Sequence, residues 1–126
     1  MKIIKIAVIL GLMSSLAFSA GFEKDAKRKD MSVHISAEKS LVVGGNKVTL
    51  SVTHKKQVLK NAEVMVKVFM PAMPGMPYME YKAKMVSNGD GTYTNNIQFA
   101  MGGTWQVHIF VNNNGKKYKI KSSVNL

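Results

Sequence analysis

Apolar and polar residues alternate with a period of two through most of the chain after residue 30. Successive side chains of a β-strand point to opposite faces of its sheet, so this alternation is typical of strands that bury one face. Turn signals rich in glycine and asparagine separate the alternating stretches, and no convincing helical period occurs among them. The predicted strands cover residues 31–37, 47–53, 63–68, 81–85, 92–99, 105–111 and 117–122. Short strands at this turn density predict an all-β fold, a single seven-stranded immunoglobulin-like β-sandwich.

The N-terminus has the pattern of a cleaved signal peptide, residues 1–19. Lys2 and Lys5 precede an uncharged apolar run that is too short for a comfortable transmembrane helix. Ala17 and Ser19 supply the small side chains of a cleavage site, which favours cleavage after Ser19. We therefore expect an exported, periplasmic protein, and the alternative is that the segment is retained as an anchor.

The charged residues that follow, 20–30, show no periodicity and predict a mobile tether in front of one folded domain, 31–126. Without the two lysines of the signal, 16 basic residues stand against 7 acidic ones, a net charge of +9. Such a charge favours anionic partners such as lipid headgroups, whereas nucleic acid is not expected as the partner of an exported protein. The row of lysines at 117, 119 and 121 is most simply the solvated face of an edge strand.

The residues that would support catalysis do not form a recognisable pattern. The chain has no cysteine, which excludes disulfides and thiolate metal sites, and it shows no zinc-type histidine spacing and no phosphate-binding glycine loop. We therefore expect no enzymatic activity and no small-molecule substrate. His34 and His108 fall in mid-strand on polar faces, where an exposed side chain is the simplest interpretation and a role of either one in completing a Cu(II) site is a weaker one. The sequence leaves open whether the two are neighbours across strands.

A methionine-rich loop carries the most specific chemical signal. Residues 70–79 read M-P-A-M-P-G-M-P-Y-M, with four methionines at a spacing of three and all three prolines of the chain. Proline disfavours both helix and central strand, so these residues predict a stiff loop. Pro74-Gly75 has the signature of a type II turn, which brings Met73 and Met76 to within about 7 Å, Cα to Cα. Thioether sulfur is a soft ligand that suits Cu(I).

Antiparallel strands alternate their connections between the two ends of a sandwich. The loops that share one end are 39–46, 70–80 and 100–104, and those at the other, lysine-rich end are 55–61, 88–91 and 112–116. The first end therefore gains Met101 as a further sulfur donor. Met70 follows Val68 in strand parity and is expected to face the core, so it is the weakest candidate. The candidate metal ligands, in order, are Met73 and Met76, then Met79 and Met101, then Met70.

Two short motifs resemble a known family. G-T-Y at 91–93 and F-A-M-G-G-T-W at 99–105, together with the M-P-A-M-P-G-M run at 70–76, resemble the YtkA-like domain, which is related to FixH. The resemblance covers roughly residues 31–124 and implies an exported or membrane-tethered immunoglobulin-like β-sandwich without catalytic machinery. It also implies a link to copper handling or to the assembly of a copper-containing respiratory oxidase. This sequence differs from FixH, which has a full membrane anchor, and that difference weakens the oxidase-assembly role.

Two functions remain open at this stage. The first is an exported Cu(I)-binding protein that acts in copper tolerance or delivery, with a periplasmic or inner-membrane protein as a further partner. The alternative is a non-catalytic adaptor or assembly factor that uses the methionine loop and the basic end for protein or membrane contacts, since methionine-rich surfaces also serve protein binding.

Overall fold

The computed structural model describes residues 21–126, so the predicted signal peptide at 1–19 lies outside the described residues. Those residues form ten β-strands, and among them no helix is present that is long and apolar enough to cross a membrane. The strands are β1 (Phe22–Arg28), β2 (Met31–Ala37), β3 (Gly44–His54), β4 (Gln57–Val58), β5 (Glu63–Met70), β6 (Met79–Lys84), β7 (Val86–Ser87), β8 (Thr92–Phe99), β9 (Thr104–Asn113) and β10 (Lys116–Asn125).

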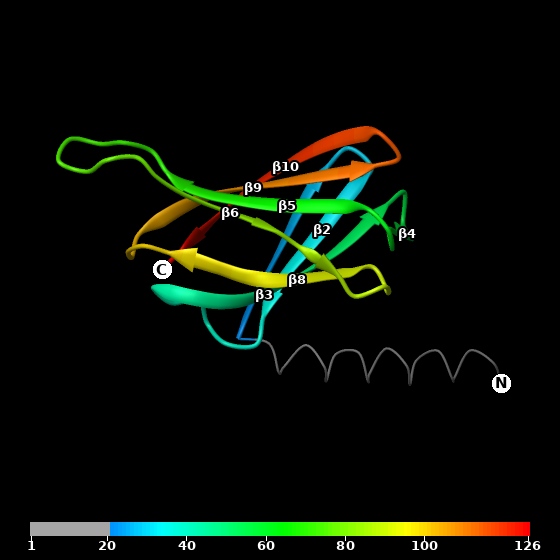
Figure 1. Ribbon diagram of the computed structural model, residues 1–126, viewed down its shortest axis with the longest axis horizontal. Coiled ribbons are helices and arrows are strands. Elements are labelled where there is room, and N and C mark those ends of the chain that lie inside the picture. The colour runs from blue at the N-terminus through cyan, green and yellow to red at the C-terminus, as the bar shows by residue number, and fades with distance from the viewer. Residues whose placement is uncertain (1–20) are drawn as a thin grey trace.

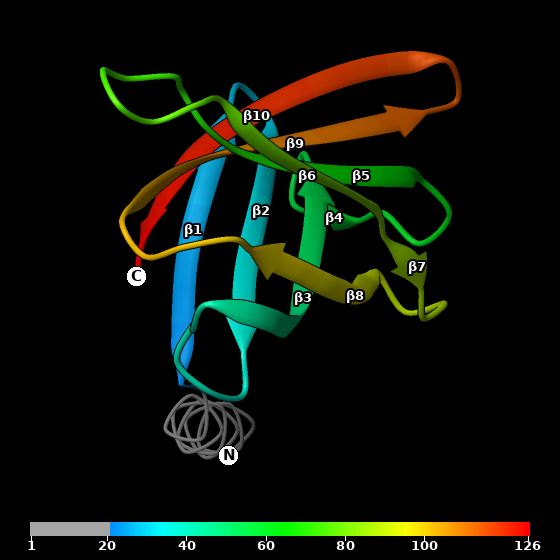
Figure 2. The same ribbon diagram turned by 60° about the vertical axis from the view of Figure 1, so that its left-hand side comes forward.

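The strands pair into two antiparallel sheets that pack face to face (Figures 1 and 2). One sheet has the order β1-β2-β3-β8-β7, with β4 paired to the end of β3, and the other has the order β10-β9-β5-β6. The prediction of an all-β sandwich is therefore confirmed. The predicted number of seven strands is wrong, because β1 and the two-residue strands β4 and β7 add to the seven that alternation revealed.

The core lies between the sheets and consists of the apolar half of each alternating strand. On β5, for example, Val64, Val66 and Val68 are buried, as the period-two pattern predicts. Trp105 on β9 is only 1% exposed and its ring packs edge-on against Phe99, at 5.5 Å between centroids. Apolar burial between two such faces is the main source of stability in a domain of this size.

The prediction of a mobile tether at 20–30 is wrong for most of its length. Residues Phe22–Arg28 form β1, which pairs along its whole length with β2. Only Ala26 of this strand is buried, so β1 carries almost no apolar alternation. Backbone pairing holds it at the edge of the sheet, and the Lys24 ammonium donates to the Ser123 carbonyl oxygen of the other sheet.

Most connections gather at two ends of the sandwich, as the antiparallel arrangement predicts, but the β2–β3 connection, predicted beside the 70–80 loop, lies at the lower edge of the domain in both views (Figures 1 and 2). Figure 1 places the 71–78 connection and the 100–103 turn toward one end, and β4 with the 88–91 and 112–116 turns toward the other. At the second end Gly91 has φ of 94°, and a Cβ there would overlap the Val58 side chain. A glycine is required at this position for both reasons.

Candidate methionine site at one end of the sandwich

Strands β5 and β6 form a hairpin whose tip carries the methionine-rich residues. Met70 pairs with Met79 at the end of the two strands, and Met73 forms a bridge with Met76 three residues further on. The Met73 N–H donates to the Met76 carbonyl at 2.9 Å, and the Met76 N–H donates to the Met73 carbonyl at 2.8 Å. The four methionines therefore form two cross-strand pairs. Their spacing of three residues, with the turn centred between Met73 and Met76, places each methionine of one arm opposite a methionine of the other.

The turn at the tip has the predicted geometry. Gly75 has φ of 82°, the value that the third residue of a type II turn requires, and Pro74 precedes it. A pair that exchanges both backbone hydrogen bonds holds its Cα atoms about 5.5 Å apart, with both side chains on the same side of the ribbon. Met73 and Met76 are therefore neighbours on a rigid turn.

Met70 and Met79 lie in strands rather than in the loop that the sequence predicted at 70–80. Met70 is buried, at 4% exposure, as its parity with Val68 predicts. A Cβ built on Gly103 would lie 3.2 Å from the Met70 methyl carbon, so Met70 fills the space beneath the 100–103 turn. This position makes Met70 a core residue rather than an accessible ligand.

The other sulfur donors differ in exposure. Met73 is half exposed, at 50%, whereas Met76, Met79 and Met101 are partly buried and pack against the core cluster. The Trp105 indole N–H donates to the Met101 carbonyl at 3.0 Å, which fixes the turn that carries Met101. The end of the sandwich thus presents methionines at graded depths, from the exposed tip to the core.

A hollow of about 340 Å³ opens beside Met79 in the seam between β6 and β8. Its lining residues are Met79, Glu80, Tyr81, Gln98, Ala100 and Trp105. The Tyr78 hydroxyl donates to Glu80 at 2.8 Å, and this hydrogen bond holds the pKa of Glu80 below its usual value and raises the pKa of Tyr78. The same carboxylate forms ion pairs with Lys82 at 3.6 Å and with Lys67 at 4.0 Å, so its charge is balanced by the lysines of β5 and β6 rather than left free for a metal ion.

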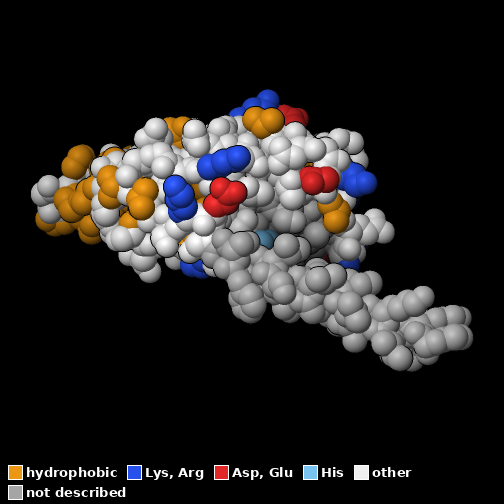
Figure 3. Space-filling view, turned by 90° about the horizontal axis from the view of Figure 1, so that it is seen from below, with side chains coloured by type: hydrophobic (Ala, Val, Ile, Leu, Met, Phe, Trp, Pro, Cys, Tyr) orange, Lys and Arg blue, Asp and Glu red, His pale blue; other side chains and the backbone are white. Residues whose placement is uncertain are grey.

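The tip itself is an apolar projection. Tyr78 is 49% exposed, and its ring lies 6.1 Å from that of Phe69 on the outer face of β5. Figure 3 shows hydrophobic side chains gathered at the end of the molecule from which the hairpin projects in Figure 1. Large contiguous apolar surfaces are a feature that sites of ligand and partner contact often share.

The histidines do not meet. His34 lies on the outer face of one sheet and His108 on the outer face of the other, so the two, whose proximity the sequence left open, are not neighbours across strands. Burial and the lysines at 119, 67 and 121 lower the pKa of His108. Among residues 21–126 no group of three His, Cys, Asp or Glu side chains is arranged so that it could hold a metal ion. This finding does not concern thioether donors.

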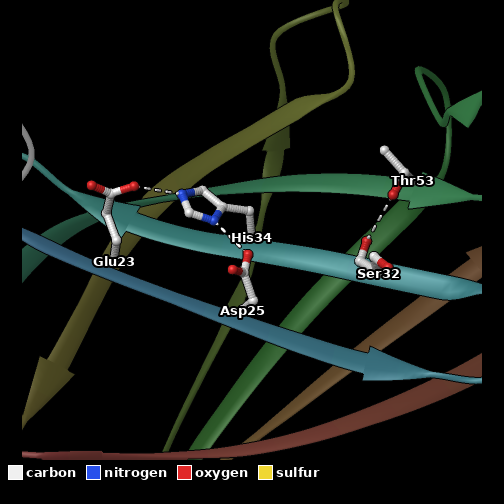
Figure 4. A network of polar contacts seen from close by, with 5 residues as sticks. All are labelled: Glu23, Asp25, Ser32, His34 and Thr53. Carbon is white, nitrogen blue, oxygen red and sulfur yellow. Dashed lines mark hydrogen bonds and ion pairs between the residues drawn. The ribbon is translucent and has the colours of Figure 1, made fainter. Parts of the chain in front are cut away.

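A polar network on β1 and β2 was not predicted from the sequence. Figure 4 shows the His34 ring between two carboxylates of β1, with Asp25 at 2.6 Å from Nδ1 and Glu23 at 3.0 Å from Nε2. The hydrogen bond to Asp25 is the main reason that the pKa of His34 is raised. Further along the same sheet, the Thr53 hydroxyl donates to the Ser32 carbonyl oxygen at 3.5 Å. The network fastens the edge strand β1 to the sheet.

Fold and site together describe a small all-β sandwich with a thioether-rich hairpin at one end. The family model described as YtkA-like matches residues 25–110, which is more than half of the chain. The chain therefore belongs to the YtkA-like family, as its motifs predicted, and the match begins within β1. No curated protein and no solved structure matches the chain in the corresponding comparisons.

Proposed function

We propose that this YtkA-like protein binds Cu(I) through thioether sulfurs at the methionine end and acts in copper tolerance or copper delivery. The observation that carries the proposal is the Met73–Met76 bridge, which holds two soft donors side by side on a type II turn. Met73 is half exposed, so an ion can reach it from solvent. Thioethers are donors of the kind that Cu(I) prefers over harder ions.

The donor set fits a monovalent, soft ion. Met73 and Met76 would supply the first two sulfurs, and Met79 or Met101, both partly buried at the same end, would supply a third. The methionine side chain has flexible torsions that let several sulfurs adapt to one ion. A thioether has no proton to lose, so binding through it does not compete with protons as a histidine site does.

We propose further that the protein is exported, non-catalytic and works with another periplasmic or inner-membrane protein. The basic and apolar start of the chain supports export, and the family resemblance supports a role without catalysis. A Cu(I) ion held at an exposed tip is placed for transfer to a second protein, because such an exchange needs the donor atoms at the surface.

Methyl NMR tests the site directly. The protein is labelled at the methionine methyl carbons and Cu(I) is added without oxygen. We expect the methyl signals of Met73 and Met76 to shift first and those of Met79 or Met101 to follow. Met31 and Met85 are buried in the core, at 0% and 5% exposure, and serve as internal controls whose methyl signals should not shift. Equal shifts of all these methyl signals, or the absence of any shift, would contradict the proposal.

A second function is favoured by the exposed apolar surface of the tip. Met73 and Tyr78 are half exposed and stand at the end of a projecting hairpin, which suits an adaptor that inserts this hairpin into a partner. Replacing Met73 and Met76 with leucine separates the two functions, because leucine keeps the apolar volume and removes the sulfur. An adaptor retains its cellular activity in this variant, whereas a copper-binding protein loses it.

A further inference from the structure

The outer face of the β10-β9-β5-β6 sheet is strongly basic. Its position follows from the alternation, since the neighbouring residues on each of these strands point into the core. The ionisable residues of this face, apart from His108, are Lys67, Lys82, Lys84, Lys117, Lys119, Lys121, Glu63 and Glu80. We call this surface the basic face. Six lysines against two glutamates on one side of a small domain make a concentrated positive field.

An aromatic strip runs through the middle of the basic face. Phe69 contacts His108 edge-on, at 4.8 Å between centroids, and His108 lies 6.2 Å from Phe110. The Lys67 ammonium sits 5.0 Å from the centre of the Phe69 ring. A largely apolar hollow of about 360 Å³ lies beside Phe110 and includes Met65, Lys84 and Lys117 in its lining. Apolar side chains are therefore ringed by ammonium groups.

The opposite face of the molecule has a different chemistry. The outer side of the β1-β2-β3-β8-β7 sheet carries hydroxyl side chains, among them Thr49 and Thr94, which pair at 3.5 Å between their oxygens. Its Glu23 and Asp25 are paired with His34, and Lys27 and Lys47 lie on the same face, so two lysines stand there against two carboxylates. The positive charge of the domain is thus unevenly distributed, and the basic face would orient the molecule in front of an anionic surface.

We propose that the basic face docks on the surface of an anionic phospholipid bilayer. The lysines complement the phosphate groups of the lipids, and Phe69, Phe110 and Tyr78 supply the amphipathic and apolar contacts that settle at the level of the headgroups. The Phe69–Tyr78 contact joins the face to the methionine hairpin at its rim. The occupant is a flat, extended array of anions, which matches a face spread over four strands better than it matches a single small anion.

The test compares two triple variants that lose the same charge. One replaces Lys82, Lys119 and Lys121 of the basic face with glutamine, and the other replaces lysines elsewhere, namely Lys27, Lys39 and Lys47. Each is mixed with phosphatidylglycerol-containing vesicles or neutral phosphatidylcholine vesicles, and the bound fraction is measured by sedimentation. All forms share the same N-terminus, so any contribution of that segment cancels in the comparison. Circular dichroism and Trp105 emission confirm the fold of each form.

We expect the unmodified protein to bind anionic vesicles and to be released as salt rises from about 0.1 M to about 1 M. The basic-face variant should bind roughly 100-fold more weakly, and the control variant should lose far less. Equal losses in the two variants would overturn the proposal, because net charge alone would then explain binding. Binding to an acidic polypeptide such as polyglutamate, without binding to anionic vesicles, would also overturn it and indicate a protein partner.

A fluorescent reporter tests which residues approach the bilayer. Phe110→Trp places an indole in the aromatic strip, and Val86→Trp places one at an exposed position on the other sheet as a control, where Val86 is 62% exposed. Anionic vesicles should shift the emission of the first variant to the blue and protect it from acrylamide, without affecting the second. The same response from both reporters, or a response from Val86→Trp alone, would contradict docking through the basic face.

Discussion

At the scale of single residues, Tyr93 shows how a polar group is accommodated inside an apolar sandwich. Its side chain is fully buried, its hydroxyl donates to the Leu59 carbonyl at 2.7 Å, and it accepts from the Ala62 N–H at 3.0 Å. One hydroxyl thus satisfies two backbone groups of the segment between β4 and β5. Alternation predicted a strand through Tyr93, but no pattern in the sequence indicated this tie between distant segments.

Replacing Tyr93 with phenylalanine should lower the free energy of unfolding by about 1–3 kcal/mol, because the Ala62 N–H is left buried without a partner. Urea denaturation followed by Trp105 fluorescence measures the change. Tyr81→Phe is the matched control, since the structure gives the Tyr81 hydroxyl no protein partner within residues 21–126, and it should stay within about 0.5 kcal/mol. A loss of the same size in both variants would contradict the assigned role.

The pairing of His34 makes stability depend on pH. The hydrogen bond to Asp25 raises the pKa of His34 above 6.5, so the folded state holds the proton more tightly than the unfolded chain does. The stabilisation is complete below the unfolded pKa and is lost as the pH rises through the folded pKa. Compared with His34→Gln, the unmodified protein should be more stable at about pH 5.5 and should lose that advantage by about pH 9. The difference in the free energy of unfolding should stay below about 1 kcal/mol, because the group is so exposed. An unchanged difference in urea midpoint across this range would refute the prediction.

At the scale of elements, the β5–β6 hairpin and strand β1 mark what the sequence can and cannot reveal. The hairpin was largely predictable: the alternation located its strands, Pro74-Gly75 specified the turn, and parity placed Met70 in the core. Strand β1 was not predictable from the alternation, because six of its seven residues are not buried and its pairing depends on backbone hydrogen bonds and charged partners. The packing of Met76, Met79 and Met101 against the core was equally invisible, since it depends on how the β5–β6 hairpin and the distant 100–103 turn meet the core.

Hydrogen exchange distinguishes a paired β1 from a mobile tether. The amides of Phe22–Arg28 that face β2 should exchange more slowly than those of an unstructured peptide, because the edge strand shares the ladder of its sheet. Ala26→Asp should abolish that protection while leaving β9 protected, since it places a charge at the one buried position of β1. Exchange of every β1 amide at the rate of an unstructured chain would contradict the assigned strand.

At the scale of the whole molecule, the sandwich separates its chemistry in space. Sulfur donors lie at one end, lysines and aromatic rings cover one outer face, and hydroxyl groups cover the other. Burial between the sheets stabilises this arrangement without using the lysines or the hydroxyl groups, whereas Met76, Met79 and Met101 also pack against the core. The β5–β6 hairpin thereby carries the methionines of the proposed site at the end of a packed sandwich.

Export is a property of the whole chain and has its own prediction. If the N-terminal segment directs secretion and is removed, the intact mass of protein recovered from the periplasm should correspond to a chain that begins at Ala20. The cytoplasmic precursor in the same cells provides the uncleaved control mass. Full-length protein found in the membrane fraction would instead support retention of the segment as an anchor.

Competition for Cu(I) with a chromophoric chelator tests the proposed copper site most directly. The unmodified protein should withdraw one ion per chain from the chelator, and its affinity should change little between about pH 7 and about pH 5.5, because thioether ligands carry no proton. Met73→Leu/Met76→Leu should lose this binding and keep its fold, while Met65→Leu, a change at a half-buried methionine far from the tip, should behave like the unmodified protein. Unchanged Cu(I) affinity in the double variant would contradict the proposed site.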